Sequence, residues 1–500
     1  MISLKTAITA GVLSFLAIFP SGAAEEAPPN KKGAEEQAHA RALPAETTTN
    51  HVVMIPGEKI AFTARAGAVR LRDAQSDAPQ ADVAYVSYER SGSDPQTRPI
   101  MFVFNGGPGA ASAWLALGAL SPWRLRFSPD AVSPSAPPTL LDNADSWIPF
   151  ADLVFVDPPG TGFSRILSDS EEVKKRFYSA QGDADALAVV VRKWLTAHGR
   201  LASPKFLVGE SYGGFRCVKL AGALREHENI GVEGLFLISP ALDFSWLLSG
   251  GNPLLRAALL PSLAAVARNA KGRADVADAE AYAAGEYAID LLKGAKDAQA
   301  LARMSAAVAQ FTGLDRALVS RLGARIDART FARERARDAG RVLSVYDGEI
   351  SGWDPDPFSP DGDWADPLLQ SWRAPLGAAM TRLIIEKLGW PIGEARYSVL
   401  SGEISHQWRY GEEGRANAEV MSGLREALAL DPRLKTFVVH GLYDLTTPYF
   451  ATKLMLDQLP DYGDASRVRL LVLRGGHMPY LYDDSRKALR DAARGWLESH

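Results

Sequence analysis

Six short runs of continuous apolar residues, most of them separated by enough chain for a helix, constrain the fold more than any other feature of this sequence. Each run ends at a polar or glycine-rich turn, and together they occupy residues 100–105, 152–157, 205–210, 234–239, 436–441 and 469–475. Such runs are typical of strands buried on both faces of a parallel sheet. Three earlier segments have the alternating or β-branched character of antiparallel strands, at residues 51–57, 59–67 and 81–90. We therefore expect an α/β fold whose mostly parallel sheet carries helices on both faces.

The alternation of strand-like apolar runs and helix-length segments stops between residues 243 and 375. There the chain is rich in alanine and arginine and its apolar spacing is helical. We interpret residues 243–375 as a helical cap inserted into a core whose two parts are residues 47–242 and 376–500. Seven arginines fall between Arg321 and Arg341, which by themselves would suggest an anionic partner. Because acidic residues are interspersed among them, a solvated helix face is the better interpretation.

The N-terminus indicates export. Lys5 precedes the apolar run at residues 6–20, and small residues typical of a cleavage site follow it. The run is shorter than the ~20 residues that span a bilayer, which favours a signal peptide at residues 1–24 over a retained anchor. Residues 25–46 are rich in Ala, Glu, Pro and Lys without periodicity, so we expect a disordered leader there. The expected protein is secreted or periplasmic, with no membrane span after cleavage.

Composition excludes several classes of protein. Hydrophobic residues make up 47% and charged residues 23% of the 500 residues, as in globular chains and unlike disordered or polytopic membrane ones. The net charge of −4 gives no sign of nucleic-acid binding, and we expect neither a cofactor nor a metal. Cys217 is the one cysteine, so no intrachain disulfide can form. The oligomeric state is not indicated.

The sequence Gly209-Glu210-Ser211-Tyr212-Gly213 joins a buried-type strand to an apolar helix pattern. In this strand–turn–helix context, the pattern G-x-S-x-G holds a serine exposed at the carboxyl end of a sheet, where it serves as a nucleophile. The alternative is a glycine-rich turn with an incidental serine, and the flanking strand and helix argue against it. We predict that Ser211 is the nucleophile of an acyl-transfer reaction.

A serine hydroxyl is a poor nucleophile unless a base accepts its proton, and histidine is the usual base. Of the eight histidines, His477 has the strongest context, because it follows the last apolar run in a glycine-rich loop. A structural loop histidine is the alternative there. His440 ends another apolar run and fits a packed core residue. We predict that His477 is the base.

An acid should lie between the nucleophile and the base in the order typical of α/β-hydrolases. Asp444 qualifies because it lies in the turn just after a buried strand, whereas Asp431 and Asp457 lie before that strand and within a helical pattern. In the predicted triad, Ser211 attacks the acyl carbon and His477 takes and returns the proton. Asp444 fixes the imidazole tautomer and stabilises the imidazolium.

The oxyanion that develops in such a reaction needs backbone N–H donors. We expect one from Tyr212, the residue after the nucleophile, and one from Gly107 in the loop Asn105-Gly106-Gly107-Pro108-Gly109. A phosphate cradle is the competing interpretation of this loop, but no Lys-Ser or Lys-Thr follows the glycines.

Taken in order, several motifs resemble those of the serine carboxypeptidases. They are NGGPG at residues 105–109, DLVFVDPPGTGFS at residues 152–164, GESYGG at residues 209–214, the turn Gly441-x-x-Asp444, and GGHMP at residues 475–479. The resemblance spans roughly residues 99–479 and is interrupted by the insertion. It implies an α/β-hydrolase core with a helical cap, and release of a residue from the C-terminus of a peptide.

In that family, the asparagine of NGGPG and the glutamate before the serine help hold the carboxylate of the substrate. The resemblance assigns this role to Asn105 and Glu210, with the N–H of Gly106 alongside. A glutamate that faces a carboxylate must be protonated to donate a hydrogen bond, so activity should favour mildly acidic pH. The alternative is that Glu210 only braces the turn.

Three positions depart from the family pattern. Val103 stands where the family has tryptophan, Ala110 where it has cysteine, and Ala119 where a second carboxylate-binding glutamate is expected. The triad is therefore better supported than the carboxypeptidase mode of binding. An esterase or acyltransferase with the same triad stays open, as does a non-catalytic binding protein on the same scaffold. The side-chain specificity is not indicated by any motif of the insertion.

Overall fold

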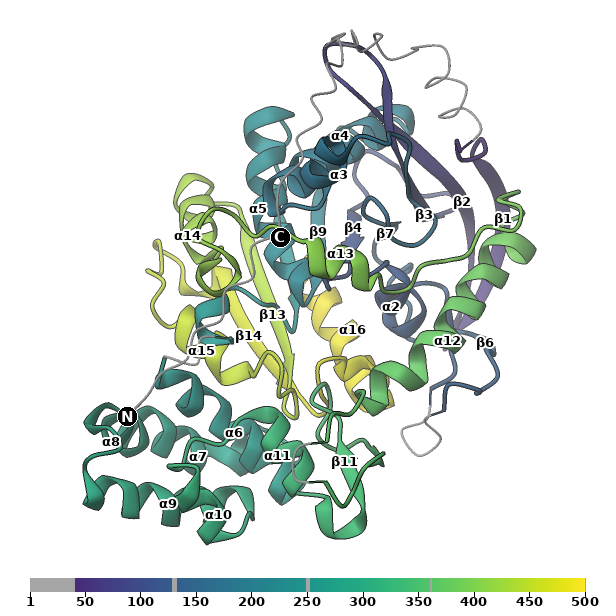
Figure 1. Cartoon of the computed structure of the whole chain (residues 1–500). Coiled ribbons are helices and arrows are strands. Elements are labelled where there is room, and N and C mark those ends of the chain that lie inside the picture. The colour runs from purple at the N-terminus through teal and green to yellow at the C-terminus, as the bar shows by residue number, and fades with distance from the viewer. Residues whose placement is uncertain (1–40, 128–132, 249–251, 360–361, 500) are drawn as a thin grey trace, which may run out of the picture.

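The computed structural model of the chain describes residues 41–127, 133–248, 252–359 and 362–499. The expected signal peptide, and residues 25–40 of the expected leader, lie outside these residues. The strands of the main sheet are β1 Thr47–Ile55, β2 Glu58–Arg72, β3 Pro79–Arg90, β4 Ile100–Phe104, β7 Asp152–Val156, β8 Arg165–Ile166, β9 Lys205–Glu210, β10 Gly234–Ile238, β13 Lys435–Gly441 and β14 Val468–Leu473. Within the described residues they are arranged in the order β1-β2-β3-β7-β4-β9-β10-β13-β14, with β8 beside β3 (Figure 1).

The sheet is antiparallel at one end and parallel over the rest of its width. β1, β2 and β3 pair antiparallel, and β3 also pairs antiparallel with β7. From β7 through β4, β9, β10, β13 and β14, every neighbouring pair is parallel. β4, β7 and β10 are buried along their whole length, which is why their sequences are apolar without alternation. The expected α/β architecture with a mostly parallel sheet is confirmed.

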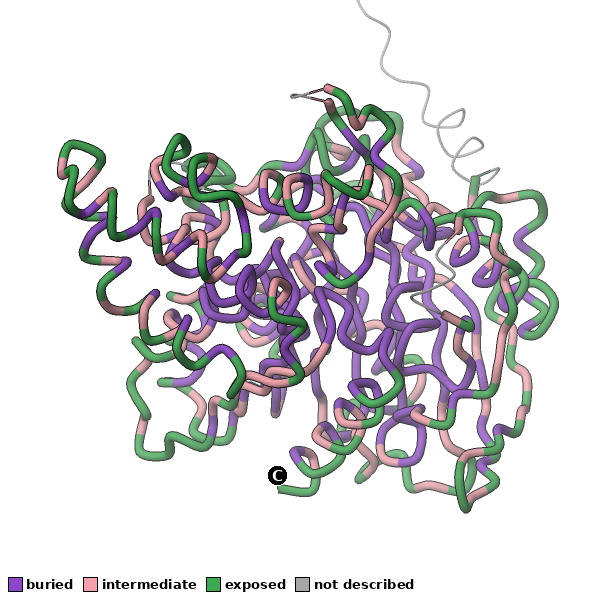
Figure 2. The backbone as a smooth tube through the Cα atoms, turned by 90° about the horizontal axis from the view of Figure 1, so that it is seen from below, coloured by how far each residue is buried: buried purple, intermediate pink, exposed green. Residues whose placement is uncertain are grey.

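Helices cover both faces of the sheet, as Figures 1 and 2 show. One apolar cluster takes side chains from α4 Ala180–Ala197, α5 Tyr212–His227 and α14 Met421–Leu430. The cluster on the other face takes them from α2 Ala113–Leu115, α12 Pro367–Arg382 and α16 Asp483–Glu498. Cys217 on α5 is a free, buried cysteine that belongs to the first cluster. The remaining elements of the core are α3 Glu171–Phe177, α13 Gly402–Gln407, α15 Tyr449–Leu456, and the paired short strands β5 Trp123–Leu125 and β6 Leu140–Asp142.

The insertion folds into helices followed by a hairpin. These elements are α6 Leu254–Arg268, α7 Ala277–Tyr282, α8 Ala288–Lys293, α9 Ala298–Thr312, α10 Arg316–Arg321, α11 Ala328–Glu334, β11 Arg341–Leu343 and β12 Ser351–Trp353. They enclose an apolar cluster of their own, which also includes Leu442, Tyr443 and Leu445 from the loop after β13. The next helix, α12, runs through residue 375 and packs on the core, so the expected end of the cap falls inside a core helix.

One arginine of the insertion, Arg333, is bound by other residues of the insertion. Arg333 is buried, where a solvated helix face was expected, and its Nε donates to Asp354 Oδ2 at 3.1 Å. The other two guanidinium nitrogens of Arg333 donate to the carbonyl oxygens of Gly362 and Asp356, at 2.7 and 2.9 Å. This guanidinium therefore organises the acidic loop after β12.

Residues 41–46, which composition assigned to the leader, pack against the core. The N–H of Leu43 donates to Asp82 Oδ2 at 2.8 Å, and the carbonyl of Ala45 accepts from Trp390 Nε1 at 3.0 Å. Because these are tertiary contacts made by single residues, no periodicity in the sequence announces them.

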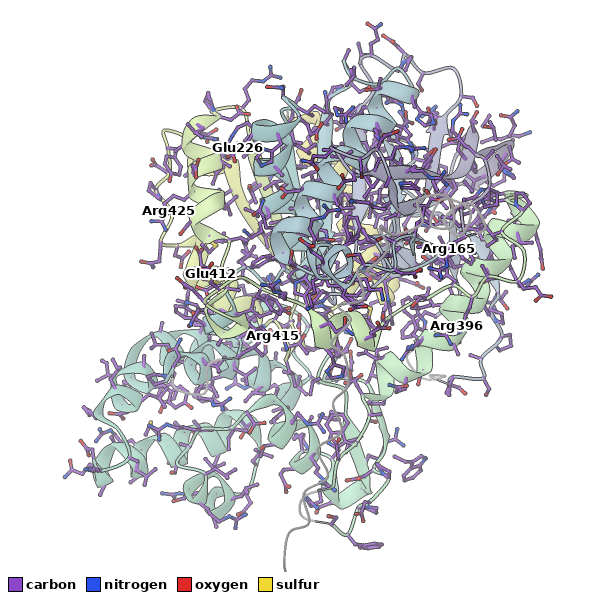
Figure 3. All side chains as sticks on the ribbon, turned by 45° about the horizontal axis from the view of Figure 1, so that its top comes forward. Arg165, Glu226, Arg396, Glu412, Arg415 and Arg425 are labelled. Carbon is purple, nitrogen blue, oxygen red and sulfur yellow. The ribbon has the colours of Figure 1, made fainter. Side chains whose placement is uncertain are left out.

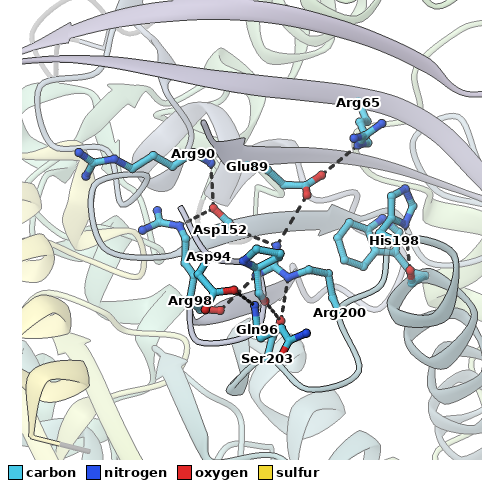
Figure 4. Close-up of polar contacts among 12 residues, drawn as sticks. Arg65, Glu89, Arg90, Asp94, Gln96, Arg98, Asp152, His198, Arg200 and Ser203 are labelled. Carbon is cyan, nitrogen blue, oxygen red and sulfur yellow. Dashed lines mark hydrogen bonds and ion pairs between the residues drawn. The ribbon is translucent and has the colours of Figure 1, made fainter. Parts of the chain in front are cut away.

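A buried ion network lies at the amino ends of the parallel strands (Figure 4). Asp152 at the start of β7 accepts from Arg98 Nε and from Arg200 Nη1, both at 2.7 Å, and Arg200 Nε donates to Ser203 Oγ at 2.7 Å. Every group has a partner, so this network joins the strand ends on the side away from the carboxyl ends. Charges of both signs lie elsewhere on the surface, including Glu226 and Arg425 in Figure 3.

Candidate active site

Ser211 joins β9 to α5 in a strained turn. Its φ is 61° and its ψ is −125°, in the region of positive φ that residues other than glycine rarely adopt. The two flanking glycines leave the turn room: a Cβ on Gly209 would lie 2.2 Å from the carbonyl oxygen of Gly213. A Cβ on Gly213 would lie 2.5 Å from the carbonyl oxygen of Phe104. The local sequence G-x-S-x-G is therefore what this geometry requires.

Asp444 and His477 form a buried acid–base pair. Nδ1 of His477 lies 2.7 Å from Oδ2 of Asp444. Oδ1 of Asp444 also accepts from the N–H groups of Thr446 and Thr447, at 2.8 and 3.0 Å. Although burial opposes ionisation, the charge of His477 and these hydrogen bonds hold the pKa of Asp444 below its ordinary value. An ionised Asp444 keeps the proton of a neutral imidazole on Nδ1, so Nε2 is left to act as a base.

Ser211 and His477 line one cavity at the carboxyl end of the sheet. Within the described residues the Ser211 hydroxyl makes no hydrogen bond, whereas the His477 ring is almost wholly buried. Burial by itself lowers the pKa of His477, but the negative charge of Asp444 and its hydrogen bond raise this pKa above the ordinary value. The arrangement thus favours a histidine that accepts a proton readily.

The glycine-rich loop after β4 lies directly against the serine turn. A Cβ on Gly106 would lie 2.5 Å from the backbone nitrogen of Tyr212 and 2.9 Å from Cβ of Ser211. Gly107 has a φ of 99°, which favours glycine. In the part of the chain that the structure describes, the N–H groups of Gly107 and Tyr212 have no hydrogen-bond partner. Two free donors beside a serine are what a tetrahedral oxyanion requires.

Asn105 and Glu210 meet in the same cavity. Nδ2 of Asn105 donates to Oε1 of Glu210 at 2.9 Å, while Oδ1 of Asn105 accepts from the N–H of Leu115 at 3.1 Å. The hydroxyl of Tyr480 donates to Oε2 of Glu210. Burial raises the pKa of Glu210 to about 7, against the charge of His477 and the hydrogen bonds of Tyr480 and Asn105, which lower it. A substantial fraction of Glu210 is therefore protonated at neutral pH.

Sequence reasoning missed Tyr480, which lies three residues after His477 and carries no motif of its own. Its ring packs against Gly118, where a Cβ would lie 2.5 Å from Cε2 of Tyr480. The neighbouring Ala119 is buried, and so is Val103. Tyr480 is therefore a hydrogen-bond partner of Glu210 that no motif of the sequence predicted.

Apolar side chains form the rest of the cavity wall, and no motif indicated them. They are Ala110, Trp114, Tyr346, Leu369, Leu400 and Met478. Tyr346 comes from the loop between β11 and β12, so the insertion contributes to the site. Its ring meets the His477 ring edge-on, with centroids 5.3 Å apart.

The other candidates lie elsewhere or serve the core. His440 is fully buried on β13, and burial lowers its pKa to about 4. Asp457 pairs with Lys453 on α15. Among the described residues, no group of three or more His, Cys, Asp or Glu could hold a metal ion. Over the same residues, no helix is both long enough and apolar enough to cross a membrane.

Comparison with known families places these features in context. Residues 56–244 match the model of the serine carboxypeptidase family. This stretch includes the glycine-rich loop and Ser211, but neither Asp444 nor His477. Serine carboxypeptidase-like 16 of Arabidopsis thaliana is 29% identical over 171 residues, which cover 33% of this chain and 38% of that protein. Pheromone-processing carboxypeptidase kex1 of Aspergillus niger is 34% identical over 148 residues, which cover 29% of this chain and 21% of that protein.

These alignments span less than half the length of either relative. Among solved structures, Kex1(delta)p, a prohormone-processing carboxypeptidase from Saccharomyces cerevisiae, has a similar fold, with a TM-score of 0.56 and 15% sequence identity. The superposition covers 88% of this chain and 92% of that one. The fold of this chain is therefore an α/β-hydrolase fold. The first part of its core is similar to the serine carboxypeptidase family.

Proposed function

We propose that this chain is a serine-type carboxypeptidase with Ser211, His477 and Asp444 as its triad. The observation that carries the proposal is one cavity that combines a strained serine, a histidine bonded to a buried carboxylate, and a second, partly protonated carboxyl group. The first three groups suffice for acyl transfer. The fourth, Glu210, is the group that a substrate with a free carboxylate would require.

The reaction proceeds through an acyl-enzyme. Oγ of Ser211 bonds to the carbonyl carbon of the last peptide bond as its proton moves to Nε2 of His477, and the oxyanion accepts from the N–H groups of Gly107 and Tyr212. The C–N bond then breaks, and the imidazolium gives its proton to the leaving amine. Water then attacks the ester: its proton goes to His477 and its oxygen bonds to the acyl carbon. The bond between the acyl carbon and Oγ breaks as His477 returns the proton to Oγ of Ser211, and the shortened peptide leaves with a new C-terminal carboxyl group.

Glu210 and Asn105 hold the terminal carboxylate of the substrate. Protonated Glu210 donates a hydrogen bond to that carboxylate, whereas ionised Glu210 repels it. Because the pKa of Glu210 is about 7, binding weakens as the pH rises above that value. On the acid side, His477 must be neutral to act as a base, and its raised pKa means that activity also falls at low pH. The proposed pH preference is therefore near neutral and bounded on both sides.

We also propose export to the periplasm or the cell exterior, on the basis of the signal-peptide pattern at residues 1–24. N-terminal sequencing of the protein recovered from separated cell fractions tests this proposal. A full-length N-terminus in the cytoplasmic fraction would contradict it.

Mass spectrometry of a peptide library tests the carboxypeptidase activity. After incubation, products should lack one residue from the C-terminus, and blocking that terminus as an amide should slow the reaction. Ser211→Ala should lower turnover by roughly 10⁴-fold or more and abolish labelling by a fluorophosphonate. Labelling that persists in Ser211→Ala would show that another residue is the nucleophile.

The second candidate is an esterase or acyltransferase with the same triad, and the buried Ala119 and Val103 favour it, because both replace residues of the family pattern. A blocked dipeptide with a free C-terminus, its amide and its methyl ester distinguish the candidates. Equal kcat/KM for the acid and the amide would reject the carboxypeptidase. A protein that hydrolyses none of the three and does not label would be a binding protein.

A further inference from the structure

The loop at residues 344–350, between β11 and β12, contacts both loops that carry the acid and the base. We call these residues the strap. The carbonyl of Val345 accepts from the N–H of Leu445 at 3.0 Å, and the N–H of Gly348 donates to the carbonyl of Tyr443 at 3.1 Å. The strap is therefore bonded to the residue before Asp444 and to the residue after it.

The strap holds the loop of the base in a similar way. The N–H of His477 donates to the carbonyl of Tyr346 at 2.6 Å, and the N–H of Gly476 donates to Oδ2 of Asp347 at 2.9 Å. Farther out, Arg474 forms an ion pair with Glu349 at 2.6 Å. One segment of the insertion thus bonds four backbone positions of the core that flank or include catalytic residues: Tyr443, Leu445, Gly476 and His477.

The approach between the strap and the base is close. A Cβ on Gly476 would lie 2.1 Å from the carbonyl oxygen of Tyr346 and 2.5 Å from Cα of Asp347. The glycine before His477 is therefore required by contact with the insertion. This explains a residue that the catalytic chemistry alone does not require.

Asp347 forms hydrogen bonds both within the strap and with the core. Its side chain is 1% exposed, and its two oxygens accept from two N–H groups: Oδ1 from Glu349 at 3.0 Å and Oδ2 from Gly476. Ser344, at the other end of the strap, donates to both oxygens of Asp366 at 2.9 and 3.0 Å. The conformation of the strap is thus fixed from within and anchored to the start of α12.

We propose that the strap is a positioning element of the active site, in which Asp347 holds His477 in register with Asp444 and Ser211. This inference rests on the proposed hydrolase activity. Asp347 does not line the cavity and acts through the backbone of Gly476. Its removal should therefore affect the chemical step more than the binding of substrate.

Three variants test the proposal in the full-length protein. Asp347→Ala removes both acceptors and should lower kcat by about 30- to 100-fold, because small displacements of a catalytic group cost rates of up to about 10²-fold. Asp347→Asn keeps one acceptor and should lower kcat by about 5- to 10-fold. KM should change less than about twofold in both. The rate of fluorophosphonate labelling at Ser211, which also needs the base, should fall in proportion to kcat.

Asp290→Asn is the matched control. Asp290 is another buried carboxylate of the insertion, and it pairs with Arg303 and Lys293 away from the catalytic loops. This variant should lower the melting temperature and leave kcat unchanged. If Asp347→Ala does not fold, Asp347→Asn decides the question.

A folded Asp347 variant with the kcat and labelling rate of the wild type would overturn the inference alone. An increase in KM without a fall in kcat would also overturn it, because that result would assign the strap to substrate binding. A wild-type protein that neither hydrolyses peptides or esters nor labels would overturn the proposed function, and this inference with it.

Discussion

Glu210→Gln separates the role of the Glu210 charge from the role of its shape. The amide has nearly the same size, its oxygen can accept from Asn105, and its nitrogen can donate to a substrate carboxylate at every pH. The substitution therefore keeps the donor and removes the ionisation. In the wild type, the pKa of about 7 leaves roughly one part in ten of Glu210 protonated at pH 8 and one part in a hundred at pH 9.

The magnitude follows from these fractions. For a peptide with a free C-terminus, kcat/KM of the wild type should fall about tenfold for each unit above pH 7, which is about 1.4 kcal/mol per unit. The amide is a weaker donor than a carboxylic acid, so the variant should start about tenfold lower at pH 6. Because it has no such decline, the two profiles should cross near pH 8.

The acid limb should shift as well. The negative charge of Glu210 raises the pKa of His477, so replacing it with an amide lowers that pKa and extends activity to lower pH. The assay is kcat/KM from pH 5 to pH 9 for a blocked dipeptide and for its methyl ester. The ester has no carboxylate, so the wild type should show little of the alkaline decline with it.

Asp347→Asn is the control for the alkaline limb. Burial also raises the pKa of Asp347 to about 7, but this carboxyl group faces backbone N–H groups and not the cavity. Asp347→Asn should lower the rate and leave the midpoint of the alkaline limb unchanged. If the alkaline limb persists in Glu210→Gln with the same midpoint, or disappears in Asp347→Asn, the assignment of Glu210 as the carboxylate-binding group is refuted.

Three further predictions concern residues around the site. Tyr480→Phe removes a hydrogen bond that lowers the pKa of Glu210, so the alkaline limb of kcat/KM should move to higher pH; an unchanged midpoint would contradict this role. The apolar cavity wall should favour peptides ending in Leu or Phe over Lys by about 10- to 100-fold in kcat/KM, and Trp114→Ala should reduce the ratio; equal rates would contradict this. Gly441→Ala should lower both activity and melting temperature, because its Cβ would lie 1.8 Å from the carbonyl oxygen of Gly476. Gly222→Ala in α5 places its Cβ in open space and should stabilise the protein by about 0.5–1 kcal/mol. Thermal unfolding of the two glycine variants measures the contrast, and similar melting temperatures would contradict it.

The sequence predicts the sheet because the signals of a buried strand are local. The runs at residues 100–105 and 205–210 are apolar without a break, since both faces of each strand are covered. The serine turn is also predictable, because its positive φ and the close approach of Gly209 to Gly213 depend on residues next to Ser211. In each case the constraint and the residues that satisfy it lie within a few positions of one another.

The rest of the site depends on contacts between distant segments. Tyr480 reaches Glu210 across 270 positions, and the pKa of Glu210 depends on burial, which no single motif specifies. The departures at Val103 and Ala119 suggested weaker carboxylate binding. The hydrogen bonds of Asn105 and Tyr480 show that Glu210 nevertheless has partners in this chain.

The contacts of the insertion with the catalytic loops are also not predictable from the sequence. Its boundaries are visible in the sequence as a change from strand to helix spacing, and this change suggests that it is separate from the chemistry. Yet residues 344–350 lie against both catalytic loops, and Leu442, Tyr443 and Leu445 beside Asp444 pack in the apolar cluster of the insertion. Without the insertion, the loops of Asp444 and His477 would lose backbone bonds on both sides and the apolar packing beside Asp444. A change of periodicity therefore marks where a segment leaves the core and returns to it. Whether the core can act without that segment depends on contacts such as the hydrogen bonds of the strap, which the periodicity does not show.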